Sequence, residues 1–182
     1  MFARTMAGKP KLNVQQFPRP PLLEKTARHL QIRWGDELIA DTKEAYWVLE
    51  THHPPSACSS HPDTSARLLT ATAYYLPPSA IKVALPKTAR STYCEWKGAA
   101  SYHAITHPST GETVSNRIWS YERPTQGFWA IKDHVSFYAG PWDCFVDGEK
   151  VEPQPGDFYG GWVTSDIDGI VKGRNGNWDP VV

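Results

Sequence analysis

The chain has 182 residues, of which 40% are hydrophobic and 21% charged, and its 19 basic residues balance its 19 acidic residues. This length and composition are typical of one globular domain with a hydrophobic core and exclude a disordered chain. The balanced charge argues against a dedicated nucleic-acid-binding protein and against attraction to an anionic membrane surface. No apolar run approaches the roughly 20 residues of a membrane span, so we expect neither nucleic acid nor a membrane as a partner.

The two ends of the chain predict flexible segments. Residues 1–16 are basic, and no acidic residue comes before Glu24. They lack the continuous apolar stretch of a secretory signal; a mitochondrial presequence is the alternative, but we expect a flexible arm. Residues 174–182 predict a flexible tail, because the turn-rich stretch GRNGN occurs at residues 173–177. Three cysteines without paired spacing favour a reducing compartment, and we expect a cytoplasmic protein.

The first half of the chain predicts short strands. HLQIRWGDELIADT, residues 29–42, predicts two strands around a Gly-Asp turn. EAYWVLE, residues 44–50, is compatible with a helix or a strand, and we predict a strand because THHPP ends it abruptly. STYCEWKGAASYHAIT, residues 91–106, predicts one strand, which returns through a glycine-containing turn as TVSNRIWSYE, residues 113–122.

The second half predicts a helix and a further hairpin. TQGFWAIKDHVSFY, residues 125–138, is the best helix candidate, with Thr125 as its N-cap. Asp147-Gly148 lies between two β-like runs and predicts a hairpin, while residues 160–180 predict one more strand or an irregular closure. These segments together predict a mainly β fold: a single compact domain of antiparallel strands, arranged as a small barrel or a folded, tent-like sheet, with one or two short helices.

Three long segments resemble one known family. They are GDELIADTKEAYWVLETHHPP, YYLPPSAIKVALPKTARSTYCEWKGAASY, and the stretch that begins IWSYERPTQGFWAIKDHVSFYAGPWDCF and ends GGWVTSDI. On these motifs the chain resembles the DUF427 family, as a fungal-type member, over residues 17–173. The resemblance implies a compact, mainly β domain whose function is not known. The sequence shows no Gly-Ser pair with a spaced acidic pair that would hold a metal and a triphosphate.

The resemblance is interrupted once. ACSSHPDTSARLLTATA, residues 57–73, separates HPP from YYLPP, which the family pattern joins almost directly. The segment is rich in Ser, Thr and Ala and has no strand alternation. It is either a surface insertion or an unspliced short intron, and we favour the second because both flanks resume the family pattern. A surface loop of this kind would be exposed and weakly ordered.

Lys97 and Glu50 are the candidate catalytic residues. Lys97 stands between a tryptophan and a glycine and precedes small residues, which leave room for a ligand carboxylate or phosphate. A structural lysine over a Trp face is the alternative. Glu50 lies in phase with Tyr46 and Val48 along its strand. If that face is buried, Glu50 could move a proton or pair with Lys97; a solvated strand end is the alternative.

Aromatic side chains supply most of the candidate binding residues. The rings of Tyr74 and Tyr75 alternate across a strand, so we expect one in the core and the other facing solvent or a cleft. We expect a pocket that suits a small planar or sugar-like ligand. The ligand-binding candidates are Tyr75, Tyr102, Trp119, Tyr121, Trp96 and Cys94.

Cys94 and Trp96 are expected chiefly to pack in the core. A nucleophilic Cys94 would need a nearby cation, and three positions along a continuous strand would direct Lys97 to the opposite face unless the chain bends at Gly98. The histidines and cysteines lack the spacing of metal ligands, and no nucleophile elbow or phosphate-cradling glycine loop is present. We therefore expect no metal and no cofactor.

Three functions remain open. The first is a small-molecule enzyme or metabolite-binding protein with an aromatic β-cleft, which performs acid–base chemistry without a redox cofactor. The second is a protein- or peptide-binding module that recognises a cation with an aromatic cage. The third is an accessory structural protein in which the aromatic residues only form the core. A homo-oligomer is compatible with each of these functions.

Overall fold

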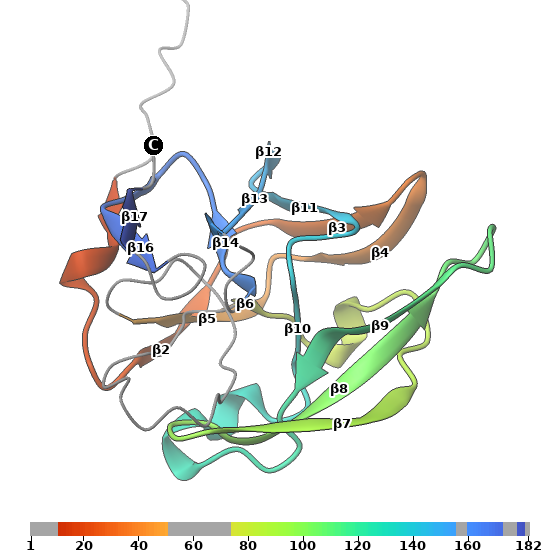
Figure 1. Ribbon diagram of the computed structural model, residues 1–182, viewed down its shortest axis with the longest axis horizontal. Coiled ribbons are helices and arrows are strands. Elements are labelled where there is room, and N and C mark those ends of the chain that lie inside the picture. Colours follow the sequence, from red (N-terminus) through yellow and green to blue (C-terminus); the bar gives the residue numbers. More distant parts are fainter. Residues whose placement is uncertain (1–10, 51–73, 156–159, 173–177, 181–182) are drawn as a thin grey trace, which may run out of the picture.

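The computed structural model describes residues 11–50, 74–155, 160–172 and 178–180 (Figure 1). The predicted insertion at residues 57–73 lies outside this part. Strands make up most of the regular structure, and the sheets that the described residues form are open rather than closed into a barrel. The mainly β prediction is therefore confirmed. The helical segments are short 3-10 helices: η1 (Val14–Gln16), η2 (Pro78–Ala80) and η3 (Gln126–Ile131).

One four-stranded antiparallel sheet has the order β12-β11-β3-β4 and contains both predicted Gly-Asp hairpins. Gly35 has a φ of 58°, and Asp147 and Gly148 have φ values of 54° and 83°, the left-handed conformations that tight hairpin turns require. The strands are β3 (Leu30–Trp34), β4 (Glu37–Thr42), β11 (Asp143–Val146) and β12 (Glu149–Lys150).

A second sheet, of order β10-β9-β8-β7, continues into a three-stranded sheet of order β2-β5-β6 through one antiparallel bridge. The N–H of Leu76 donates to the carbonyl of Val135 at 2.8 Å, and the N–H of Val135 donates to the carbonyl of Leu76 at 2.9 Å. The strands are β2 (Leu22–Thr26), β5 (Ala45–Leu49), β6 (Tyr74–Tyr75), β7 (Lys87–Cys94), β8 (Gly98–Thr106), β9 (Thr113–Ser120) and β10 (Val135–Phe137).

Three two-stranded pairings complete the described structure. They are β1 (Leu12–Asn13) with β15 (Ile167–Asp168), β13 (Glu152–Pro153) with β14 (Trp162–Val163), and β16 (Ile170–Lys172) with β17 (Trp178–Pro180). Residues 11–16 and 178–180, which the sequence assigned to a flexible arm and tail, thus contain regular structure. The reason in the first case is burial, since Val14 packs against Ile167. The division at residues 17 and 173 stays a prediction.

Two buried clusters lie on opposite faces of shared strands. Tyr74 packs in the larger cluster and its neighbour Tyr75 in the smaller one, and Ile118 and Trp119 divide in the same way. Successive strand residues point to opposite faces, so these strands form a wall between two cores. The smaller cluster, called the aromatic core below, consists of Val48, Tyr75, Cys94, Ala100, Tyr102, Trp119, Tyr121, Phe128 and Ile131.

The predicted helix over residues 125–138 is mostly wrong. Only η3 is helical, and β10 follows it because Val135 and Phe137 pair with β9. Thr125 does not cap the helix with its side chain, because its Oγ1 donates to the carbonyl of Trp96 instead.

The single strand predicted over residues 91–106 is also divided. A tight turn at residues 95–97 separates β7 from β8, and the two halves pair with each other. The division occurs where Gly98 adopts a φ of 93°, a conformation that L side chains rarely adopt.

Candidate functional site

Glu50 follows the last residue of β5 and is fully buried. Val48 belongs to the aromatic core, and Tyr46 packs against it. Because side chains two positions apart on a strand share a face, Glu50 is directed to the same side. The strand face that the sequence suggested is therefore the buried one.

Lys97 is also fully buried, although it lies in the turn between β7 and β8. Its Nζ lies 5.8 Å from the centroid of the Phe128 ring. The turn is fixed from the side by Thr125, whose N–H donates to the carbonyl of Lys97 at 3.2 Å. This bend, and not strand alternation, decides where the lysine points, and it brings Lys97 close enough to interact electrostatically with Glu50.

Arg19 contacts Glu50 and is itself partly exposed. Its Nη1 lies 3.7 Å from Oε1 of Glu50, and its Nη2 lies 3.4 Å from Oε1 of the exposed Glu95. The guanidinium also lies 5.9 Å from the ring centroid of Trp96. The Arg19 side chain is 29% exposed, whereas that of Glu50 is fully buried. The sequence did not indicate Arg19, since it precedes every predicted element.

Burial raises the pKa of Glu50 to about 8. The positive charges of Lys97 and Arg19 act in the opposite direction but do not outweigh the loss of hydration, and Cys94 and Glu95 add to the rise. At neutral pH the carboxyl is therefore mostly protonated. A protonated carboxyl beside a lysine is a group that can donate a proton to a bound molecule.

Four of the aromatic candidates are buried members of the aromatic core. Tyr75, Tyr102, Trp119 and Tyr121 are each at most 1% exposed. Nε1 of Trp119 donates to the hydroxyl of Tyr75 at 3.4 Å, and the rings of Tyr75 and Tyr121 lie 6.2 Å apart. The expectation that one ring of the Tyr74-Tyr75 pair faces solvent or a cleft is wrong, because each ring is buried in its own core.

The structure therefore brings the sequence candidates together. Cys94 and Ala100 lie in the same cluster as the tyrosines, and Trp96 packs against it. Cys94 is a buried thiol outside any disulfide bond, as expected of a packing residue.

The family model for a domain of unknown function (DUF427) matches residues 22–151, which include Glu50 and Lys97. The chain belongs to the DUF427 family. A search among curated proteins found no match. Arg19 lies just before the matched range of this DUF427 chain, and the pairing of β13 with β14 lies after it.

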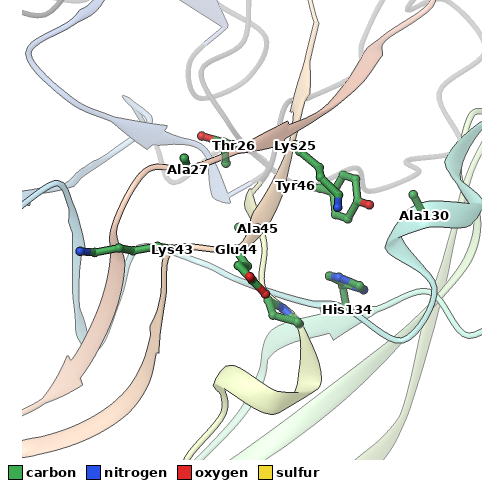
Figure 2. A pocket seen from close by; sticks show the side chains of 10 residues that line it. Lys25, Thr26, Ala27, Lys43, Glu44, Ala45, Tyr46, Ala130 and His134 are labelled. Carbon is green, nitrogen blue, oxygen red and sulfur yellow. The ribbon is translucent and has the colours of Figure 1, made fainter.

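A hollow lined by described residues of this DUF427 chain lies beside the aromatic core (Figure 2). It has a volume of about 530 Å³. Figure 2 shows Lys25, Tyr46 and His134 among the side chains that line it, and the rings of Tyr46 and His134 lie 5.5 Å apart in an edge-to-face contact. Tyr46 connects the two regions, since it packs against the aromatic core and also lines the hollow. The sequence did not single out this hollow.

Two further findings apply to the described part of the chain. It contains no group of three or more His, Cys, Asp or Glu side chains placed to hold a metal ion. No described helix is long and apolar enough to cross a membrane.

Proposed function

We propose that this DUF427 protein is a small-molecule enzyme or metabolite-binding protein that performs acid–base chemistry with Glu50 and Lys97, without a redox cofactor. The observation that supports this most is the burial of a carboxyl and a lysine together against an aromatic core. Removing both groups from water costs several kcal/mol for each ion, and a buried pair is weak evidence for stability. Such a pair with a shifted pKa is typical of a functional site.

The proposed roles follow from charge and position. Lys97 holds an anionic group of the ligand, and Glu50, protonated at neutral pH, donates a proton to it. Tyr75 and Tyr121 orient the ligand from the aromatic side. Arg19 is partly exposed and contacts both the buried Glu50 and the exposed Glu95, so the proposed entry of the ligand displaces it from these carboxyl groups.

The aromatic cage is the weaker candidate. A cage that binds a foreign cation needs open ring faces. Here the chain's own cations lie over several rings: Arg90 lies 4.7 Å from the ring centroid of Tyr102, and Arg117 lies 4.3 Å from that of Tyr138. These contacts favour the acid–base site over the cage.

The test is a thermal-shift screen of the purified chain against a broad small-molecule panel, with Lys97→Met and Glu50→Gln in parallel. A compound present at 100 times its Kd stabilises the folded chain by about 2.7 kcal/mol, or roughly 5–10 °C for a domain of this size. We expect this shift in the wild type and not in Lys97→Met.

Glu95→Gln is the matched control, because it changes a carboxylate that is 60% exposed and contacts the same arginine. It should retain most of the shift. Circular dichroism establishes that each variant is folded before it is compared. The proposal is wrong if no compound shifts the wild type, or if both folded variants of the buried pair respond as the wild type does.

A further inference from the structure

A serine and a histidine form a hydrogen-bonded pair on the other face of the same sheet. Nε2 of His103, on β8, lies 2.8 Å from Oγ of Ser120, on β9. Cross-strand pairing sets this contact, since Ser101 pairs with Ser120 and His103 with Ile118. Side chains on one face of paired strands contact each other diagonally, so the two groups lie on one face.

The backbone orients the imidazole. Nδ1 of His103 lies 3.2 Å from the carbonyl oxygen of Leu85. A carbonyl oxygen can only accept, so Nδ1 carries the proton and Nε2 presents its lone pair to the hydroxyl of Ser120. The N–H of Ala104 donates to the carbonyl of Pro86 at 2.8 Å and holds the segment with Leu85 against β8. The register of β8 against β9 shifts between His103 and Ala104, so the strand pairing is irregular beside the pair.

The histidine is suited to accept a proton. Burial lowers the pKa of His103, and the Leu85 carbonyl and the Glu122 carboxylate oppose this only in part. The neutral ring therefore predominates at neutral pH. Glu122 is itself paired with Nζ of Lys87 at 2.5 Å, so the two charges beside the imidazole offset each other.

A hollow of about 430 Å³ opens beside this pair. Its apolar lining residues are Pro78, Ile81, Val83, Leu85 and Val135, and its polar lining residues are His103, Ser120, Glu122 and Asp133. Nζ of Lys132 lies 3.8 Å from the Asp133 carboxylate. Each carboxylate of the hollow thus has a lysine beside it, and the hollow suits an uncharged molecule with a short apolar group.

We propose that Ser120 and His103 are the nucleophile and general base of a second site, one that hydrolyses small uncharged esters. A nucleophile within hydrogen-bond reach of a base, with the base held by a third group, is the arrangement that activates a serine. This site is separate from Glu50 and Lys97, which lie on the aromatic-core side of the sheet.

The reaction takes place in two balanced steps. Oγ of Ser120 attacks the ester carbonyl carbon while its proton passes to Nε2 of His103; the bond to the alcohol then breaks, and the alcohol leaves with that proton. Water next gives a proton to His103 and attacks the acyl carbon. The tetrahedral intermediate then collapses: the bond from Oγ of Ser120 to the acyl carbon breaks, the proton on Nε2 of His103 passes to Oγ, and the acid is released.

Acyl transfer also needs N–H groups that stabilise the oxyanion. Val83 and Leu85 border the hollow, and neither of their backbone N–H groups donates a hydrogen bond within the described part of the chain. These two N–H groups are the proposed donors.

The experiment uses a fluorophosphonate probe and p-nitrophenyl butyrate. The probe traps an activated serine because its phosphorus–fluorine bond breaks as Oγ bonds to phosphorus. We expect one label per chain, which peptide mass spectrometry locates on Ser120. His103→Gln should lower the labelling rate and the ester hydrolysis at least about 100-fold, since general-base catalysis contributes factors of about 10²–10⁴.

Ser91→Ala is the matched control, because Ser91 is a β7 serine whose hydroxyl donates to the carbonyl of Ala100 at 2.8 Å. It should leave labelling unchanged. Mapping the label on the wild type does not depend on how well any variant folds. The proposal fails if Ser120 stays unlabelled, or if folded His103→Gln is labelled as fast as the wild type.

Discussion

Glu50 shows how a single side chain changes its chemistry with its surroundings. On a solvated strand end it would be ionised at neutral pH, whereas burial beside the aromatic core raises its pKa to about 8. The sequence could indicate that Glu50 shares a strand face with Tyr46 and Val48, because the alternation of side chains along a strand is a local property. It could not indicate the burial or Arg19, since both depend on segments that are distant in the chain.

The raised pKa makes stability depend on pH. The folded chain keeps the Glu50 proton up to about pH 8, whereas the unfolded chain loses it near the ordinary value of 4.5. Folding therefore takes up a proton between these pH values. The protonated carboxyl contributes to the free energy of unfolding at low pH, and this contribution is lost as pH rises towards and through 8. We expect the ratio of folded to unfolded wild type to fall by up to about tenfold per pH unit relative to Glu50→Gln, measured by urea unfolding from pH 5 to 8.5.

Glu95→Gln again serves as the control. Glu95 is 60% exposed and is the smallest of the named contributions to the raised pKa of Glu50, so its replacement should retain most of the pH dependence of unfolding. Parallel pH curves for wild type and Glu50→Gln would contradict the assigned protonation of Glu50.

At the scale of elements, the local turn signals predicted the hairpins well. A Gly-Asp or Asp-Gly pair between β-rich runs is sufficient, because the left-handed turn conformation depends on those residues alone. The segment at residues 125–138 could not be predicted in this way. Its C-terminal part becomes β10 because Val135 pairs with Ser120, a residue that local helix spacing does not consider.

A second prediction concerns the turn between β7 and β8. Gly98 has a φ of 93°, and an added Cβ would lie 3.4 Å from the backbone oxygen of Arg123. Gly111 has a φ of 73° but no atom within 4 Å of such a Cβ. Gly111→Ala should therefore cost only the conformational penalty of about 1–2 kcal/mol. Gly98→Ala should cost more, because its φ of 93° lies further outside the left-handed region of about 50–70° that L residues can adopt, and the added methyl group has little free space.

Chemical denaturation of both variants measures this difference. Equal losses of unfolding free energy would contradict a greater backbone constraint at Gly98 than at Gly111. A larger loss in Gly98→Ala, together with the loss of any ligand response in the thermal-shift screen, would connect the turn to the site.

At the scale of the whole molecule, a buried ion pair joins an N-terminal segment of the chain to a C-terminal segment. Arg28, just before β3, contacts Asp166, whose side chain is 1% exposed. The hydroxyl of Thr164 donates to the same carboxylate at 2.6 Å, and the N–H of Leu12 donates to the carbonyl of Asp166 at 2.7 Å. Burial alone would raise the pKa of Asp166, but the hydrogen bonds from Arg28 and Thr164 outweigh it and lower the pKa.

Breaking this pair should destabilise the molecule strongly. Asp166→Asn leaves the guanidinium of Arg28 partly buried without its countercharge, which typically costs about 3–5 kcal/mol. Because the folded pKa is lowered, the stabilisation is present at neutral pH and lost as pH falls through it. Asp143→Asn, which breaks the exposed pair with Lys150, is the control and should leave unfolding nearly unchanged. Comparable losses in the two variants would contradict the buried role of Asp166.

The sequence by itself determined the β class, the Gly-Asp hairpins, the family and the phase of side chains along each strand. These properties depend on neighbours a few positions apart, where backbone preference and alternation are sufficient. Only the tertiary structure decided that two cores share one wall of strands, that Arg19 contacts Glu50, and that His103 meets Ser120. These contacts join segments that are far apart in the chain, so their geometry depends on strand pairing and burial, which no local pattern encodes.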